Sequence, residues 1–170
     1  MQIQVDTREH KSEWERIRKQ FDKLNVEYFR SKLYVGDYQS LDNPRLVVDR
    51  KKNLQELVGN VTQQHERFRK ELIRANKAGI QVVILVEHGQ GIESLEDMWF
   101  WKNPRKHEVR YRTVNGKKER YVISAKATDG EQLYKSLNTM RERYGVKFAF
   151  CEKKDTGKEI IRILSGGEHE

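Results

Sequence analysis

The chain has 170 residues, a length that suits one domain burying a hydrophobic core without disulfides or a structural metal. Hydrophobic residues make up 36% and charged residues 35%, and the single cysteine, Cys151, excludes an internal disulfide and a cysteine-based zinc site. No apolar stretch reaches the roughly 20 residues that span a bilayer, and the N-terminus carries no signal-peptide pattern. We therefore expect a cytoplasmic protein, in a reducing compartment, with no membrane partner.

The positive charge is concentrated in one segment. The formal net charge is +8, and residues 102–126 contain nine Lys or Arg against two Glu, so the rest of the chain is nearly neutral. A segregated basic segment indicates a contact surface for a polyanion. The alternative is a basic loop that is simply solvated.

The first half of the chain alternates strand-like and helical patterns. Alternating apolar and polar residues predict strands, and apolar residues at spacings of three and four predict helices. A helix at 12–24 would place Trp14, Ile17, Phe21 and Leu24 at helical spacing, with Ser12 as its N-cap. The other predicted elements are strands at 2–6, 26–30, 32–35, 38–41 and 45–50, helices at 54–59 and 62–78, and a buried strand at 81–87.

Residues 90–127 interrupt this pattern and are predicted to form an insert. Asn115-Gly116 separates two strand-like runs, 109–114 and 117–122, which is typical of a hairpin with a type I′ turn. Both faces of this hairpin would carry charge, so we expect it to project from the body. The register that the turn imposes would pair Val114 with Lys117 and Arg112 with Glu119.

The earlier pattern then resumes. A helix at 129–144 ends at Gly145, a strand follows at 146–151, and a last helix at 156–164 is capped by Asp155 or Thr156. Strands separated by helices predict an α/β fold with a mixed central sheet flanked by helices. We expect one domain at 1–165, with the basic β-hairpin insert at about 90–127 and a loose tail at 166–170.

Carboxylates and a lysine stand at the ends of predicted strands, at Asp6, Asp37, Asp49 and Lys51. Because side chains alternate along a strand, Asp49 and Lys51 fall on one face of the sheet and Arg50 on the other. Carboxylate oxygens are ligands for Mg²⁺, and a nearby lysine can orient water or stabilise charge during phosphodiester hydrolysis. On its own Asp-x-Lys is a weak signal, and its alternative is a surface ion pair.

Three motifs in order resemble the XPF-family nuclease domain. They are Val5-Asp6-Thr7-Arg8-Glu9, Gly36-Asp37 and Val48-Asp49-Arg50-Lys51. The family signature reads Gly-Asp, a variable gap, then Glu-Arg-Lys and a later Asp. The resemblance covers residues 1–90 and 127–165, with the basic insert outside it, and it implies a restriction-endonuclease-like fold of the PD-(D/E)XK superfamily.

The resemblance also implies roles for individual residues. Asp37 and Asp49 would bind Mg²⁺ or Mn²⁺, with the Arg50 carbonyl completing the set, and Lys51 would act on the water or the phosphate. Asp6 would be an auxiliary catalytic acid beside the site, with Arg8 and Glu9 as supporting polar groups.

Two departures from the signature matter. Asp49 replaces the usual Glu and is one methylene shorter, so the metal would sit closer to the strand or bind through water. Gln55 stands where the family has its later Asp and supplies no charge, although Glu56 is adjacent. Reduced activity or an altered metal preference would follow from this second departure.

The predicted function is a metal-dependent DNA endonuclease that favours branched or flapped DNA. Family members that cut such DNA carry tandem helix-hairpin-helix modules, and this chain ends six residues after Leu164. We therefore expect those modules to be absent and the basic segment to supply the grip on DNA. The candidate DNA-binding residues are Arg110, Arg112, Lys117, Lys118 and Arg120 of the hairpin, with Arg67 and Lys70 of the 62–78 helix.

Two other functions remain open at this point. The chain could be a catalytically silent DNA-binding pseudo-nuclease, as Gln55 allows, or a subunit whose role is mainly assembly. A homodimer through the last strand and helices is expected, and the face carrying Ile160, Ile161 and Leu164 would suit it. RNA is not excluded as a substrate.

Several further side chains have competing interpretations. His65 would more often be a packed core histidine than a ligand, and Glu71 would lie near the active site only if it matches a polar family position. Trp99 and Trp101 would stack on bases or, more simply, anchor the insert to the body. Cys151 is expected to be inert.

Overall fold

A computed structural model describes residues 1–88, 91–122, 124 and 126–166. The predicted tail therefore lies outside the described residues except for Gly166 at its start. The strands are β1 (Gln2–Val5), β2 (Glu27–Arg30), β3 (Tyr38–Ser40), β4 (Asn43–Lys51), β5 (Gln81–Glu87), β6 (Val109–Val114), β7 (Lys117–Val122) and β8 (Lys147–Cys151). The helices are α1 (Lys11–Lys23), α2 (Leu54–Val61), α3 (His65–Lys77), α4 (Gly130–Tyr144) and α5 (Thr156–Leu164), with short 3-10 turns η1 (Glu96–Phe100) and η2 (Pro104–Lys106).

Six strands form one mixed sheet in the order β2-β1-β3-β4-β5-β8. β3 runs antiparallel to both β1 and β4, whereas the pairs β1/β2, β4/β5 and β5/β8 are parallel. The sheet confirms the predicted α/β class with mixed pairing. It also leaves β8 as an edge strand and places β4 near the centre.

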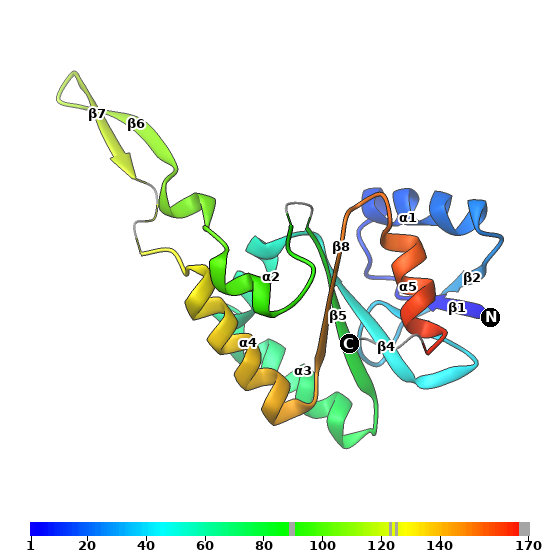
Figure 1. Ribbon diagram of the computed structural model, residues 1–170. Helices are drawn as coiled ribbons and strands as arrows, with labels where there is room; N and C mark the ends of the chain where they lie inside the picture. Colours follow the sequence, from blue (N-terminus) through cyan, green and yellow to red (C-terminus); the bar gives the residue numbers. More distant parts are fainter. Residues whose placement is uncertain (89–90, 123, 125, 167–170) are drawn as a thin grey trace.

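Helices cover both faces of this sheet, as Figure 1 shows, with α2, α3 and α4 on one face and α1 and α5 on the other. Each face has its own hydrophobic core, and β5 contributes to both. Ile84 and Val86 point into the first core, and Val83 and Leu85 point into the second. Burial on two faces explains why β5 is a continuous apolar run instead of an alternating one. None of the helices in the described part of the chain is long and apolar enough to cross a membrane.

The helix ends agree with the sequence in α4 and differ in α1. Asp129 accepts a hydrogen bond from the Gln132 N–H in a capping box, and Gly145 ends α4 in the left-handed conformation at φ 64°. α1 begins earlier than predicted, so its N-cap is His10 and Ser12 lies inside the helix. The helix ends at Lys23, so Leu24, which was predicted inside it, is the C-cap and is 47% exposed.

Two other predicted elements are corrected. Residues 32–35 form a loop, because the Leu33 N–H donates to the buried Asp6 carboxylate at 2.7 Å and not to a neighbouring strand. The predicted helix at 62–78 starts only at His65, after a break that separates it from α2. His65 is exposed in the first turn of α3, so its interpretation as a packed core histidine is wrong.

The insert contains the predicted hairpin of β6 and β7, which projects from the body in Figure 1. Val114 pairs with Lys117 and Arg112 with Glu119, which confirms the register. Asn115 and Gly116 have φ values of 50° and 75°, as a type I′ turn requires.

The base of the insert is packed against α4. Met98 is fully buried and Trp101 packs on the first core, while Trp99 meets Tyr134 edge-on at 5.5 Å between ring centroids. These contacts support the simpler interpretation of the two tryptophans, as anchors of the insert. Gly130 makes the fit possible, since a Cβ there would lie 2.3 Å from the Met98 carbonyl oxygen.

Candidate functional site

A polar pocket opens where β4 ends, and it brings together the predicted catalytic, metal-binding and supporting residues except Asp6. Asp37, Asp49 and Lys51 all line it, which places the Gly-Asp and Asp-Arg-Lys motifs in one site. The remaining lining residues come from the loop after β1, from α1, from the turn before β3, from the end of β4 and the residue after it, and from helices α2 and α3. They are Arg8, Glu9, His10, Ser12, Glu13, Gly36, Arg50, Lys52, Glu56, Arg67 and Glu71.

Gly36 sets the position of Asp37. It has φ +74°, and a Cβ at this residue would lie 3.1 Å from the Val48 carbonyl oxygen. The chain can therefore pass close to β4 only with glycine here. Asp37 is then held to β4 twice, because its N–H donates to Val48 O at 2.9 Å and its Oδ2 accepts from the Arg50 N–H at 2.8 Å.

Asp49 and Lys51 lie on one face of β4, as the strand period predicts. Lys51 Nζ donates to Asp49 Oδ1 at 2.8 Å and stands 5.6 Å from the Phe68 ring centroid. Burial lowers the pKa of Lys51, but the carboxylates of Asp49 and Asp37 outweigh this effect and raise the pKa. The lysine is therefore held as a cation between two carboxylates.

The acidic pair is suited to a hard cation. Among the described residues no hydrogen bond reaches Asp37 Oδ1 or Asp49 Oδ2, so each carboxylate keeps one oxygen free. Burial and the neighbouring Asp49 carboxylate raise the pKa of Asp37 well above its usual range, so a positive charge here would be favourable. No three His, Cys, Asp or Glu side chains of the described residues form a complete ligand set. Mg²⁺ fits this arrangement, since it takes one or two carboxylates and completes its shell with water and phosphate.

Asp6 lies behind the pocket and does not line it. Its carboxylate is fully buried and accepts from the Arg8 N–H, Nε and Nη2 and from the Leu33 N–H, at 2.7 to 2.8 Å. Burial raises the pKa of Asp6, but these hydrogen bonds outweigh burial and lower it. Asp6 thus joins two loops and orients Arg8, which does line the pocket.

On the opposite face of the sheet, Arg50 is the centre of a buried ionic network. Its Nε and Nη2 donate to both carboxylate oxygens of Glu9, at 3.1 and 2.7 Å, and its Nη1 lies 3.4 Å from Glu87 Oε1. Glu87 is also ion-paired with Arg16 and accepts from Thr156 Oγ1 at 2.8 Å. Burial lowers the pKa of Arg50, and the carboxylates of Glu9 and Glu87 raise it by more.

The sequence missed most of this network. Glu9 was predicted only as a supporting group, and the contributions of Glu13, Arg16 and Glu87 were not predicted. The available signal was Glu87, a carboxylate that ends a run of residues buried on both sides. Such a charge requires a partner, but the partner lies on α1, far away in sequence.

Helices α2 and α3 close the pocket on its other side. Gln55 does not line it, because its amide donates to Asn103 Oδ1 at the base of the insert. Glu56 lines it instead and accepts from the Lys52 N–H at 2.9 Å. Arg67 and Glu71 line it from α3.

The other predicted DNA-binding residues lie away from the pocket. Lys70 lines a separate shallow depression with no acidic residue, together with Tyr34, Ile73, Arg74, Lys77 and Ala78. Arg110, Arg112, Lys117, Lys118 and Arg120 are exposed along the hairpin.

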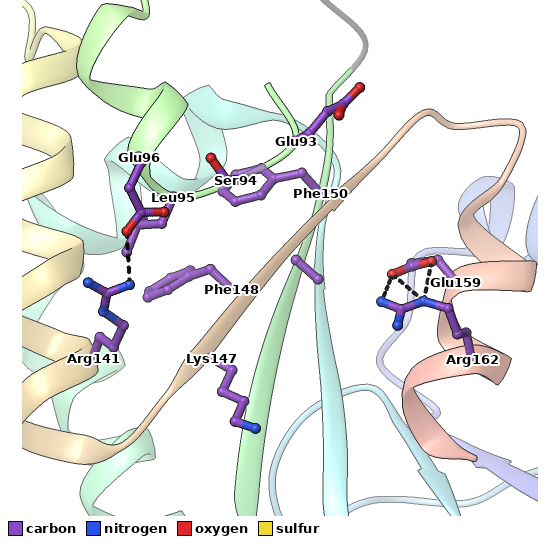
Figure 2. Close-up of a pocket in the computed structure, with 11 residues that line it drawn as sticks. Glu93, Ser94, Leu95, Glu96, Arg141, Lys147, Phe148, Phe150, Glu159 and Arg162 are labelled. Atoms are coloured by element: carbon purple, nitrogen blue, oxygen red, sulfur yellow. Dashed lines mark hydrogen bonds and ion pairs between the residues drawn. The ribbon is translucent and has the colours of Figure 1, made fainter. Parts of the chain in front are cut away.

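A further depression follows the edge strand β8 and shares no lining residue with the acidic pocket. Figure 2 shows Phe148 and Phe150 on the side of β8 that faces η1 and α4, with Arg141 paired to Glu96 at 3.2 Å. Glu159 and Arg162 lie on the other side, on α5. The predicted dimer face on α5 is corrected, because Ile160 and Leu164 are buried inside the chain's own second core.

Comparisons with known proteins agree with this fold. XPF from Aeropyrum pernix superposes with a TM-score of 0.62 at 18% identity, covering 100% of this chain and 63% of that chain. XPF from Aeropyrum pernix in complex with DNA gives a TM-score of 0.58 at 17% identity, covering 96% and 63%. The chain thus spans 63% of the length of these solved chains, and it shares the restriction-endonuclease-like fold of their nuclease domain.

A comparison with curated proteins finds no match. The model of the ERCC4 domain matches residues 5–163, which is most of the chain. The motifs that resembled the XPF-family nuclease lie inside this match, at the pocket formed by Asp37, Asp49 and Lys51. The chain therefore belongs to the ERCC4 domain family.

Proposed function

We propose that this protein is a divalent-metal-dependent DNA endonuclease. The observation that carries the proposal is the shared pocket of Asp37, Asp49 and Lys51, in which each carboxylate keeps one oxygen without a hydrogen bond from the described residues, beside a buried ammonium. Membership of the ERCC4 domain family supports nuclease chemistry, and a similar solved structure is described as a complex with DNA. Residues 1–165 would act as one nuclease unit, with 90–127 as an insert.

Asp37 and Asp49 would hold Mg²⁺ or Mn²⁺, with the main-chain carbonyl of Arg50 as a third ligand. The Arg50 N–H already contacts Asp37 at 2.8 Å, so this peptide lies beside the carboxylates. A bound divalent cation would lower the pKa of water and offset charge on the phosphate. Asp49 is shorter than Glu, which favours a position of the ion close to β4.

Lys51 would contact the attacking water or a phosphate oxygen. The carboxylates of Asp49 and Asp37 raise the pKa of Lys51, which favours the ammonium form that donates hydrogen bonds and stabilises negative charge. Asp6 is proposed as a positioning residue in place of an acid acting on substrate, because among the described residues its carboxylate accepts hydrogen bonds only from Arg8 and Leu33. Glu9 would support the site by anchoring Arg50.

DNA would reach the pocket across α3. Arg67 lines the pocket, and Lys70 and Arg74 follow it at helical spacing on the same side of the helix. The depression around Lys70 has no acidic lining residue, which suits a phosphate backbone. The hairpin cations Arg110, Arg112, Lys117, Lys118 and Arg120 would extend the contact surface beyond the body.

The expected substrate is branched or flapped DNA. The test is cleavage of labelled duplex, single-stranded, flap, fork and four-way-junction DNA in Mg²⁺, in Mn²⁺ and in EDTA. We expect metal-dependent cutting that is strongest on a branched substrate. Equal cutting of all duplexes would contradict the substrate preference while leaving the nuclease proposal intact.

A catalytically silent DNA-binding module is the alternative, and Gln55 favours it. Gln55 stands where the family signature has a carboxylate, and its amide donates a hydrogen bond to Asn103. Glu56, the next residue, lines the pocket instead. Binding without cutting, in either metal and on every substrate, would support this alternative.

The protein is also proposed to form a homodimer through β8 and its flanking helices. β8 is an edge strand, and its depression contains both signs of charge, Arg141 and Lys147 with Glu96 and Glu159. Such a surface can be self-complementary about a two-fold axis. Sedimentation at several concentrations should give a dimer, and Phe148→Asp should convert it to monomer. A monomer at every concentration would contradict this proposal.

A further inference from the structure

The two faces of the β6–β7 hairpin differ chemically. Opposite residues in an antiparallel pair point to the same side, so the register assigns each side chain to a face. The first face carries Val109, Tyr111, Thr113, Lys118, Arg120 and Val122. The second face carries Arg110, Arg112, Val114, Lys117, Glu119 and Tyr121.

The second face is largely self-neutralised. Arg112 pairs with Glu119 at 3.4 Å and also covers the Tyr121 ring, with its Cζ 5.4 Å from the ring centroid. Arg110 pairs with Glu108 at 3.3 Å. Tyr121 is consequently only 37% exposed, and Lys117 beside the turn is the remaining cation without a partner in the described part of the chain.

The first face has the opposite character. Tyr111 is 67% exposed, and Arg120 stands directly across from it, with Lys118 at the diagonal position. Neither cation has an acidic partner among the described residues, and the face itself has no carboxylate. An open aromatic ring flanked by free cations is the combination that binds an unpaired strand, since the ring stacks on a base while the cations contact phosphates.

We propose that the face formed by Tyr111, Lys118 and Arg120 is a binding site for single-stranded DNA, in which Tyr111 stacks on an unpaired base. The hairpin projects from the body and neither of its strands belongs to a hydrophobic core among the described residues, so the face is free to receive a strand. Of the basic residues on the hairpin, the two on the first face, Lys118 and Arg120, would therefore contact the unpaired strand. The choice of DNA as the ligand rests on the proposed nuclease function. The arrangement of Tyr111, Lys118 and Arg120 on one face is independent of that proposal.

The test is fluorescence quenching of 2-aminopurine placed at each unpaired position in turn of a forked DNA, in EDTA so that no cleavage occurs. Stacking on tyrosine quenches the probe, so the wild type and Tyr111→Phe should quench it at one or two positions. Tyr111→Ala should abolish that quenching and weaken binding of the fork by about tenfold.

Matched variants on the second face serve as controls. Tyr121→Ala removes the same ring, and Arg110→Ala/Lys117→Ala removes the same charge as Lys118→Ala/Arg120→Ala. We expect the first-face variants to bind the fork at least severalfold more weakly than the matched second-face variants, which lose only the general charge of the insert. Circular dichroism should give the same melting curve for all of them, because every substituted side chain is exposed.

Equal weakening on the two faces, or quenching that persists in Tyr111→Ala, would overturn the proposal. Cleavage is measured separately in Mg²⁺ on the same fork. Tyr111-dependent quenching without any cleavage by the wild type would support this site and count against the nuclease proposal. Cleavage by the wild type, together with quenching that does not depend on Tyr111, would support the nuclease proposal and overturn this site.

Discussion

At the scale of single residues, β4 depends on a buried charge pair behind the proposed site. The side chains of Arg50 and Glu9 are each only 5% exposed, and the Arg50 N–H holds Asp37. We expect Glu9→Gln to lower the free energy of unfolding by about 3 kcal/mol, because it leaves Arg50 buried with less compensation. Urea unfolding measures this decrease.

The control for that variant is Glu15→Gln. Glu15 makes a comparable ion pair with Arg18, but both side chains are well exposed. Exposed pairs contribute about 0–1 kcal/mol, so the control should be nearly silent. Equal effects of the two substitutions would contradict the structural importance of the Glu9–Arg50 pair.

A second residue-scale prediction concerns Cys151. Burial raises the pKa of this thiol to about 12. Since only the thiolate reacts, alkylation by iodoacetamide at pH 8 should be roughly a thousandfold slower in the folded protein than in urea. In the folded protein the alkylation rate should keep rising with pH above the range in which an ordinary cysteine thiol is already fully ionised. Comparable rates in the two states would contradict the raised pKa.

The residues that the sequence predicted best are those in local motifs. Asp37, Asp49 and Lys51 could be placed together because a turn and a strand period determine where they point. The role of Asp6 could not be predicted in this way, because its carboxylate accepts a hydrogen bond from the Leu33 N–H. Leu33 lies in a loop that the sequence predicted to be a strand. Side-chain bonds between distant segments have no signature in local sequence.

At the scale of elements, the contact between η1 and α4 fixes the base of the insert. The Gly130 N–H donates to Trp101 O at 3.1 Å, and a Cβ on Gly130 would meet backbone atoms of Met98 and Trp101 at 2.3 to 2.8 Å. Gly130→Ala should therefore destabilise the protein by about 2 kcal/mol or more, because backbone has to move. Thermal unfolding, followed by circular dichroism, measures the change.

Gly59→Ala is the matched control for this prediction. Gly59 lies inside α2, and a Cβ there would meet nothing within 4 Å. Alanine should stabilise the helix by about 0.5–1 kcal/mol. If both substitutions stabilised the protein, the close contact at Gly130 would be disproved.

Elements with strong periodicity were predicted well, and short irregular ones were not. α4 has a capping box at its start and a left-handed glycine at its end, so local residues predict both of its ends. The break between α2 and α3 was predicted at residues 60–61 but lies at 62–64, where no glycine or proline marks it. Residues 32–35 have the composition of a strand, but they form a loop that buries Leu33 and Val35.

At the scale of the whole molecule, the two-core body and the projecting hairpin are expected to be energetically separate. No residue of β6 or β7 belongs to either core in the described part of the chain. Replacing residues 109–122 with a short Gly-Ser turn should leave the urea midpoint of the body unchanged. DNA affinity should fall, and the slope of log K against log salt should become less negative by about 0.7 for each single-strand phosphate that the hairpin cations no longer neutralise.

Two results would contradict this prediction, one for the stability of the body and one for the contact with DNA. A large drop in the urea midpoint would mean that the hairpin stabilises the body. An unchanged salt slope would mean that its cations do not contact phosphate. The sequence predicted the hairpin itself because Asn115-Gly116 and the charge on both strands are local features.

The central claim is that Asp37, Asp49 and Lys51 form a metal-dependent site that cuts DNA. The most direct measurement compares wild type with Asp49→Asn, following cleavage and binding of one forked DNA in Mg²⁺. The substitution keeps the size of the side chain and removes the charge that a cation and Lys51 both use. We predict cutting by the wild type, cutting slower by at least about a hundredfold in Asp49→Asn, and equal binding by both. Cutting that survives in Asp49→Asn would place the chemistry elsewhere and contradict the account.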